Sequence, residues 1–272
     1  MEAARVAAER GHEVVLYEKA SRLGGLVPLS AIVKDCETPE LGEFVRYQER
    51  ELRKNKVTVH LGNAVTPEIV RKERPDALVI AAGAAHTEFD LPGANRASVI
   101  RTEKLYAMLD FFLKFLSPGQ LQKLTHLWMP VGRSVVVMGG TLHGCELAEF
   151  LVKRHRRVAI AHNGPASELG NEMGIDDLAN LWPWFKQKHV SLWPDVGYRE
   201  ITSDGLKIQQ HDKRSYILKG KNIVNTQDWT ANTALIELLS PLVGETHVAG
   251  SCREPSLLAD ATREGVLAGC AV

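Results

Sequence analysis

A glycine-rich turn is the feature of the sequence whose residue types and spacing point most directly to chemistry. An apolar run at residues 135–138 leads into Gly139 and Gly140, and a helical pattern begins near Gly144. Strand, glycine turn and helix in this order are the context that a dinucleotide-binding motif requires. Gly139 would permit a tight turn, and Gly144 would let the helix approach the sheet and offer its N-terminal N–H groups to a pyrophosphate. The expected cofactor-binding residues of this turn are Gly139, Gly140, Thr141, Leu142, His143 and Gly144.

Two residues depart from the usual form of this motif. Thr141 occupies the place of the middle glycine, and His162 occupies the place where an acidic ribose ligand is usual, about 20 residues on. A protonated His162 near Arg154, Arg156 and Arg157 would suit a 2′-phosphate. We therefore expect NAD(P)H as the ligand, with NADPH slightly favoured over NADH. The alternative is a strand–turn–helix junction that binds no nucleotide.

A second, less complete nucleotide motif lies near the N-terminus. Glu18 ends an apolar run at residues 12–17, where the ribose-binding carboxylate of such a motif belongs. The following segment, Ala20–Gly25, is similar to Ala166–Asn171, which follows the equivalent run of the other motif, and this similarity favours a duplication. The first strand and its glycine turn are missing from this motif, because the helical pattern begins at residue 2. We therefore expect the first sheet to lack its central strand, and the N-terminus to be truncated within the motif.

The elements that must position these residues alternate between strands and helices. Such alternation predicts an α/β fold with parallel sheets. Strands are expected at 12–17, 57–61, 77–83, 134–138, 157–161 and 246–250, and shorter ones at 190–193, 206–210, 215–218 and 222–226. Helices are expected at 2–10, 40–54, 142–154, 175–188 and 256–268, with an amphipathic pattern over 103–128 that breaks at 117–119.

Composition excludes several functional classes. The 272 residues contain 33 Lys and Arg against 33 Asp and Glu, so charge gives no reason to expect a nucleic acid or a membrane as partner. The four cysteines are scattered, without metal-binding or redox spacing, which predicts no metal site and favours a reducing, cytoplasmic environment. No apolar run reaches the roughly 18 residues of a membrane span, and no signal peptide is evident.

Four stretches carry a resemblance to a known family. MEAAR, GHEVVLYEK and RLGG near the N-terminus resemble the FAD domain of old yellow enzyme-like NADH:flavin oxidoreductases, the group that includes 2,4-dienoyl-CoA reductase and trimethylamine dehydrogenase. PDALVIAAGA at residues 75–84 resembles the second nucleotide motif of the family, and residues 135–151 resemble its NAD(P) motif. HVAGSCREP at residues 247–255 resembles its closing flavin motif, with Ser251 in place of the usual Asp.

The resemblance implies two Rossmann-like FAD/NAD(P)-binding domains, the second inserted in the first. Residues 1–117 and 243–272 would form the FAD-binding domain, 118–130 a linker or insertion, and 131–242 the NAD(P)-binding domain. The residues implied in cofactor binding outside the glycine turn are Glu18, Lys19, Arg22, Gly24, Gly25, Ala82, Gly83, His162, Gly250 and Ser251.

The implied function is that of a FAD-dependent NAD(P)H oxidoreductase module. It would pass hydride or electrons from NAD(P)H to FAD and on to a barrel domain with FMN and an iron–sulfur centre, which this sequence does not contain. No acid, base or nucleophile can be named, so the catalytic residues are unknown. Two alternatives stay open: a non-catalytic nucleotide-binding remnant, and a subunit of a split enzyme that docks on a barrel partner, for which the apolar segment 105–116 is a candidate surface.

Overall fold

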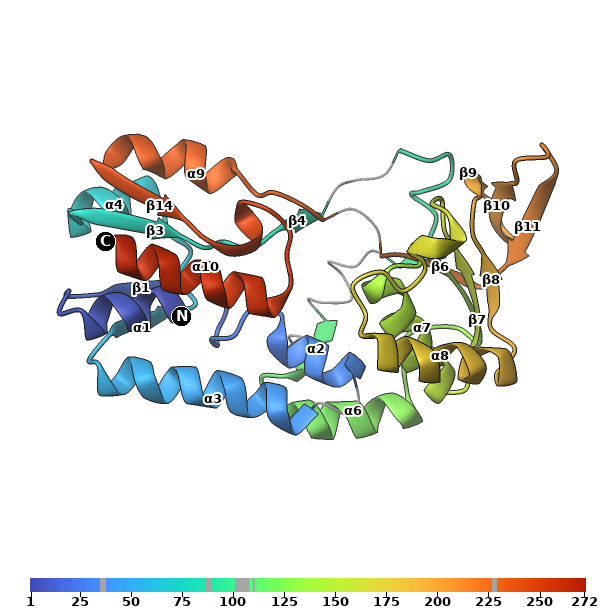
Figure 1. Ribbon diagram of the computed structural model, residues 1–272, viewed down its shortest axis with the longest axis horizontal. Coiled ribbons are helices and arrows are strands. Elements are labelled where there is room, and N and C mark those ends of the chain that lie inside the picture. The colour runs from blue at the N-terminus through green and yellow to red at the C-terminus, as the bar shows by residue number, and fades with distance from the viewer. Residues whose placement is uncertain (35–37, 87–89, 101–107, 110, 227–228) are drawn as a thin grey trace. The chain divides into compact units, whose positions relative to one another are not determined.

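The computed structural model divides the chain into two compact units (Figure 1). The terminal unit contains Met1–Pro28, Pro39–Thr87 and Trp229–Val272, and the inserted unit contains Leu29–Thr38 and Glu88–Asp228. The structure describes residues 1–34, 38–86, 90–100, 108–109, 111–226 and 229–272. The predicted fold class, α/β with one domain inserted in the other, is confirmed. The division at 87/88 and 228/229 differs from the boundaries at 117 and 243 that the sequence suggested.

The terminal unit contains two pairs of parallel strands. Strand β1 (Val15–Glu18) pairs with β2 (Thr58–Leu61), and β3 (Ala77–Ile80) pairs with β14 (Glu245–Val248). In the described part of the chain these two pairs share no strand. A short antiparallel ladder of β4 (Ala85–His86) and β13 (Trp229–Thr230) adjoins the two points where the chain passes between units.

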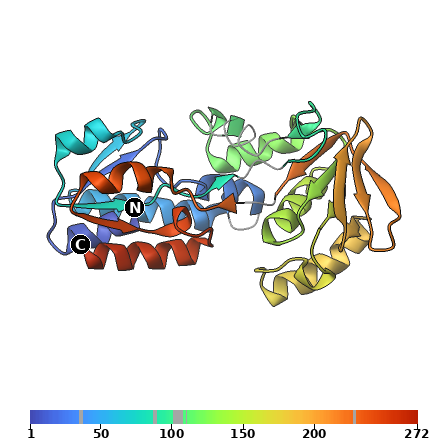
Figure 2. The same cartoon turned by 90° about the horizontal axis from the view of Figure 1, so that it is seen from above.

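Close helix packing joins the two ends of the chain in the terminal unit. Helix α1 (Glu2–Glu9) lies along α10 (Leu258–Ala271), as Figure 1 and Figure 2 show. A Cβ atom on Gly269 would lie 2.6 Å from the carbonyl oxygen of Ala3, so only glycine allows this approach. The remaining helices of the unit are α3 (Thr38–Lys54), α4 (Pro67–Glu73) and α9 (Ala234–Leu239), while α2 (Val27–Lys34) spans the boundary between the units.

A five-stranded parallel sheet forms the centre of the inserted unit. Its order is β5 (Val99–Ile100), β12 (Asn222–Asn225), β6 (Ser134–Met138), β7 (Arg157–Ala161) and β8 (Ser191–Trp193). Three consecutive valines of β6, at 135–137, are almost completely buried, as expected for a strand covered on both faces. This burial explains why the strand is a continuous apolar run rather than an alternating one.

Two different layers cover the sheet of the inserted unit. Val135 and Val137 belong to one hydrophobic cluster with residues of α7 (Leu142–Lys153) and α8 (Ile175–Gln187). Val136 and Met138 belong to another cluster with an antiparallel sheet of β9 (Gly197–Ile201), β10 (Gly205–Gln209) and β11 (Ser215–Lys219). The alternation of side chains along β6 therefore divides its residues between a helical and a β layer.

A buried arginine connects α7 to α6 (Pro118–Leu127). Arg154 is only 1% exposed, and its Nε donates a 2.6 Å hydrogen bond to Oγ1 of Thr125 on α6. Its guanidinium also lies 3.6 Å from the centre of the Phe150 ring. A buried charge is tolerated only when it is hydrogen-bonded, so this contact fixes the position of α6. The apolar segment 105–116 lies partly outside the described residues.

Candidate nucleotide-binding sites

The glycine turn of the inserted unit joins β6 directly to α7. Gly139 has φ +102°, a conformation that residues with a Cβ atom rarely adopt. A Cβ atom on Gly144 would overlap the carbonyl oxygen of Gly139 and lie 3.0 Å from Oγ1 of Thr226. The first turn of α7 is therefore packed against the strand end, and helix geometry leaves the N–H groups of His143 and Gly144 without intrahelical partners. This is the local arrangement in which helix N-termini bind phosphate groups.

His162 lies immediately after β7, beside this turn. Its side chain is buried, and Nδ1 accepts a hydrogen bond from the backbone N–H of Gly140 at 3.3 Å. Because Nδ1 accepts, we assign the ring proton of neutral His162 to Nε2. Nε2 is buried and has no hydrogen-bond partner in the described structure, and Oε2 of Glu168 is 3.5 Å away. An unsatisfied buried polar atom is costly in a folded protein, and here it lies where a dinucleotide ribose is expected.

The segment 164–174 covers the glycine turn. The N–H of Gly170 donates to the carbonyl oxygen of Gly140 at 2.7 Å, and the N–H of Leu142 donates to the carbonyl oxygen of Asn171 at 3.1 Å. One of the N-terminal donors of α7 is therefore already paired. The thiol of Cys145 also donates to the Gly140 carbonyl, at 3.2 Å, and burial raises the pKa of this thiol to about 12. Cys145 is consequently a packed thiol rather than a nucleophile.

The arginine cluster expected around His162 does not form. Arg154 and Arg156 precede β7, and Arg157 is its first residue, whereas His162 follows its last residue. Five residues of strand separate these ends by roughly 16 Å. Arg154 is buried against α6, and Arg156 donates to the carbonyl oxygens of Val131 and Arg154. The grouping of these three cations with His162 was wrong because an extended strand places them at opposite edges of the sheet.

In the terminal unit, the predicted residues near the N-terminus follow the carboxyl end of β1. Oε1 of Glu18 accepts a hydrogen bond from the N–H of Ala20 at 2.8 Å. Gly24 has φ +99°, and a Cβ atom there would lie 2.9 Å from Val45 on α3. Lys19 and Gly25 are exposed, and Arg22 is half-buried.

The other predicted residues of the terminal unit follow the paired strands β3 and β14. Ala82 and Gly83 come after β3, and Gly83 has φ +76°. Gly250 and Ser251 come after β14, where the N–H of Gly250 donates to Oε2 of Glu264 at 2.7 Å. The predicted residues thus lie at strand carboxyl ends, in the turns after them or in the first turn of α7, the edge at which open α/β sheets bind ligands. Glu264, on α10, was not anticipated from the sequence.

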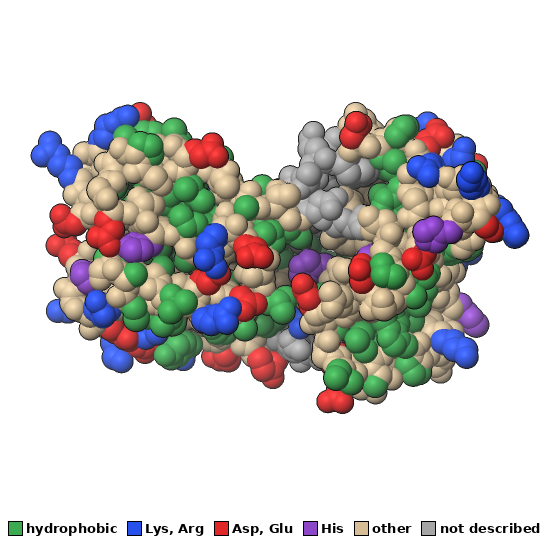
Figure 3. Space-filling model, turned by 45° about the horizontal axis from the view of Figure 1, so that its top comes forward, with side chains coloured by type: hydrophobic (Ala, Val, Ile, Leu, Met, Phe, Trp, Pro, Cys, Tyr) green, Lys and Arg blue, Asp and Glu red, His purple; other side chains and the backbone are tan. Residues whose placement is uncertain are grey.

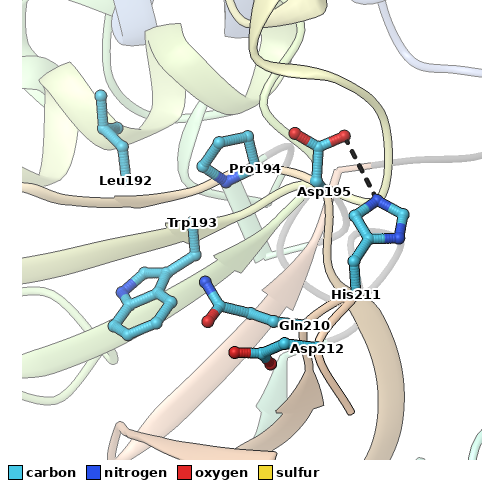
Figure 4. Close-up of a pocket in the computed structure, with 7 residues that line it drawn as sticks. All are labelled: Leu192, Trp193, Pro194, Asp195, Gln210, His211 and Asp212. Carbon is cyan, nitrogen blue, oxygen red and sulfur yellow. Dashed lines mark ion pairs between the residues drawn. The ribbon is translucent and has the colours of Figure 1, made fainter. Parts of the chain in front are cut away.

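A surface pocket of about 510 Å³ lies beyond β8, next to the turn between β10 and β11 (Figure 4). Sequence reasoning predicted no site at its lining residues, which are Leu192, Trp193, Pro194, Asp195, Gln210, His211 and Asp212. The N–H of Asp195 donates to the carbonyl oxygen of Gly164, and the N–H of His162 donates to that of Trp193. The pocket therefore adjoins the backbone of the loop that begins at His162. Because open α/β sheets bind ligands at the carboxyl ends of their strands, the predicted strand at 190–193 could have indicated this pocket.

The described residues contain neither a metal-binding cluster nor a membrane-spanning helix. Among the described residues, no three His, Cys, Asp or Glu side chains gather as metal ligands would. No helix in the described ranges is long and apolar enough to cross a membrane. On the face drawn in Figure 3, acidic and basic side chains are interspersed.

Comparison with known proteins identifies the class of protein that this fold and these turns define. The sequence profile of the pyridine nucleotide-disulphide oxidoreductase family matches residues 1–224. The chain belongs to this family, which confirms the class of protein expected from the sequence.

Individual relatives match most of the length of this chain. The chain is 29% identical to the bilirubin reductase of Mediterraneibacter gnavus over 209 residues, which are 77% of this chain and 29% of that protein. It is 28% identical to the NADH oxidase of Thermoanaerobacter brockii over 266 residues, 97% of this chain and 38% of that protein. The chain thus spans about a third of the length of these curated relatives.

A solved structure of a 2-naphthoyl-CoA reductase has a similar fold, with a TM-score of 0.82 and 22% identity, covering 100% of this chain and 38% of that chain. Histamine dehydrogenase from Rhizobium sp. 4-9 follows with a TM-score of 0.77 and 16% identity, covering 98% of this chain and 39% of that chain. The resemblance to the FAD/NAD(P)-binding half of old yellow enzyme-like oxidoreductases is confirmed by these matches.

Proposed function

We propose that the chain is the nucleotide-binding module of a flavin-dependent oxidoreductase, taking NAD(P)H in its inserted unit and FAD in its terminal unit. The observation that carries the proposal is the glycine turn of the inserted unit. Gly139 and Gly144 bring the N-terminus of α7 against the end of β6, and the buried, unsatisfied Nε2 of His162 lies beside this turn. Both features fit a bound dinucleotide, whose pyrophosphate and ribose supply the missing partners.

The residues of the inserted unit would hold and orient the nicotinamide coenzyme. The N–H groups of His143 and Gly144 face the pyrophosphate position by helix geometry. The closeness of Gly144 to Gly139 keeps these donors at the strand end. When bound, the nicotinamide supplies hydride and the flavin accepts it. The contribution of this chain is therefore positioning, and none of its residues is assigned as an acid, base or nucleophile.

In the terminal unit, the residues that would hold FAD follow strands β1, β3 and β14. Glu18 would bind the adenosine ribose through the carboxylate oxygen that Ala20 leaves available. Gly24 and Gly25 would line the cofactor beside Glu18, and Gly83 and Gly250 would do so after the other two strands. Ser251 can offer one uncharged hydrogen bond, and in the structure its hydroxyl lies 3.4 Å from the carbonyl oxygen of Ser256.

The whole protein in which this module works would contain a barrel domain with FMN and an iron–sulfur centre, on the same polypeptide or on a partner. The support is that the chain spans only 29% and 38% of the length of two relatives named as reductase and oxidase. Electrons would leave the FAD of this module for that domain, and the final acceptor would be bound there.

A titration followed by an anaerobic reduction tests the proposal. Binding of NADH or NADPH is measured by coenzyme fluorescence, with Gly144→Ala as the matched variant that blocks the turn. The chain mixed with excess FAD is then exposed to the coenzyme, and bleaching of the flavin absorbance is followed. We expect saturable coenzyme binding by the native chain and no binding by Gly144→Ala. We also expect the coenzyme to bleach the flavin faster in the presence of the native chain than in a solution of free FAD.

The non-catalytic alternative rests on one observation, the hydrogen bond by which Asn171 occupies the N–H of Leu142. If that hydrogen bond persists when a nucleotide is present, the N-terminus of α7 has one fewer backbone N–H group available to bind a phosphate. Absence of binding to either coenzyme at millimolar concentration would favour this alternative over the oxidoreductase.

A further inference from the structure

The side chains of His162 and Glu168 lie side by side at the carboxyl end of β7. The Gly140 N–H occupies Nδ1 of His162, so the remaining ring proton is on Nε2, which lies 3.5 Å from Oε2 of Glu168. His162 is buried, whereas the Glu168 side chain is 52% exposed and accessible to a ligand. Neither oxygen of Glu168 satisfies Nε2, which is left without a hydrogen bond among the described residues.

Gly164 keeps the space at this pair open. A Cβ atom on Gly164 would overlap Oε2 of Glu168 and lie 2.8 Å from Nε2 of His162. The 3₁₀ turn at Ala166–Glu168 then reverses the chain, so that Glu168 reaches the end of β7 although it is seven residues beyond it. The carboxylate thus stands in the region where the acidic residue of a dinucleotide site is expected, but it comes from the next loop.

The two side chains offer one hydrogen-bond acceptor and one donor, which is what two neighbouring hydroxyl groups of a ribose require. One ribose hydroxyl can donate to the Glu168 carboxylate while a neighbouring hydroxyl oxygen accepts from Nε2 of His162. A 2′-phosphate would instead place about two negative charges beside the same carboxylate. The cations that could offset this repulsion, Arg154, Arg156 and Arg157, lie at the other end of β7.

We propose that Glu168, held beside His162, is the residue that selects NADH over NADPH. This inference rests on the proposed function of the inserted unit and reverses the coenzyme preference expected from the sequence. Hydrogen bonds to a charged group contribute about 1.5–3 kcal/mol, or roughly tenfold to a hundredfold in affinity. The unphosphorylated coenzyme is therefore expected to bind at least roughly tenfold more tightly.

The test uses ADP-ribose and its 2′-phosphate, which present the adenosine half of each coenzyme without nicotinamide or flavin chemistry. Dissociation constants for both are measured by calorimetry on the full chain, on Glu168→Gln, and on the control Glu172→Gln. Glu172 is an exposed carboxylate on the same loop, so its removal changes the net charge equally. Thermal unfolding of the three proteins confirms that they are folded.

The expected result is a preference for ADP-ribose of roughly tenfold or more in the native chain, reduced to about threefold or less in Glu168→Gln. Glu172→Gln should retain the native ratio within about twofold. Tighter binding of the 2′-phosphate by the native chain, or an unchanged ratio in Glu168→Gln, overturns the assignment of Glu168 alone. Failure of the native chain to bind either compound overturns the assignment together with the proposed function.

Discussion

The backbone N–H of Leu142 donates a 3.1 Å hydrogen bond to the carbonyl oxygen of Asn171. Leu142 is the first residue of α7, and Asn171 belongs to the loop that carries Glu168. A second bond from Gly170 to Gly140 ties the same loop to the glycine turn. The end of α7 that we propose binds the pyrophosphate and the loop that we propose binds the ribose are therefore one hydrogen-bonded structure, and substitutions in either part should alter nucleotide affinity.

Gly144→Ala should disrupt this structure at its tightest contact. The added methyl group would overlap the Gly139 carbonyl, so α7 must move away from β6. We expect the free energy of unfolding to fall by about 1–3 kcal/mol, as for other overpacked sites, and coenzyme binding to be lost. Urea denaturation measures the change in the free energy of unfolding.

A control for this substitution is Gly119→Ala in α6, where an added Cβ meets no atom within 4 Å. Alanine is the better helix former, so this variant should be unchanged or more stable by up to about 1 kcal/mol. Equal stabilities of the two variants would contradict the packing described here.

Thr125→Val should destabilise the inserted unit without changing its coenzyme preference. The substitution removes the acceptor of the 2.6 Å hydrogen bond from Nε of Arg154 while keeping the side-chain shape. A buried donor left without its partner costs about 1–3 kcal/mol, which chemical denaturation can detect. The ratio of NADH to NADPH affinities should stay constant, because Arg154 lies at the far end of β7 from His162. A changed ratio would show that the arginines do act at the ribose.

The cysteines should differ sharply in reactivity. Burial raises the pKa of Cys145 to about 12, whereas Cys270 is exposed. Alkylation at pH 8 followed by peptide mass mapping should find Cys270 modified, and Cys145 and Cys252 protected until the protein is denatured. Rapid modification of Cys145 in the native protein would refute this burial.

The same thiol should make stability depend on alkaline pH. An unfolded cysteine has a pKa near 8.5, so the raised pKa of about 12 in the folded state favours the protonated, folded form. This contribution is fully present below about pH 8.5 and is lost as pH rises toward 12. Because tyrosines and lysines also titrate in this range, the measurement is the difference from Cys145→Ala, whose stability should fall less steeply.

The fold was predictable where one pattern dominates a segment. The buried run Val135–Met138, the glycines after it and the helical pattern of 142–154 all agree with the structure. Helix α4 was missed, although Thr66 as N-cap and Pro67 as first helical residue are a recognised start signal. Strand β9 was missed because its charged residues, Arg199 and Glu200, hide the alternation of a short strand.

The residues around the candidate ribose site show a different limit of sequence reasoning. Distance along the chain suggested that Arg157 and His162 act together, but five strand residues keep them apart. Glu168 is farther than Arg157 from His162 along the sequence but lies closer to it in space. Gly164 and the 3₁₀ turn reverse the direction of the chain and place Glu168 beside His162. Strand periodicity predicts which face a residue occupies, whereas the path of a loop depends on contacts that periodicity does not contain.

The pairing of α1 with α10 also sets the order in which the protein can fold during its synthesis. A ribosome that has passed residue 228 has already made every segment of the inserted unit. Helix α1 is synthesised before this unit and α10 after it, and α1 must wait for α10 because Ala3 and Val6 pack against Gly265 and Gly269. Long-range contacts of this kind form late and slowly. Helix α1 must therefore keep its α10-facing apolar surface uncovered, and available to chaperones, until residues 258–271 have been synthesised.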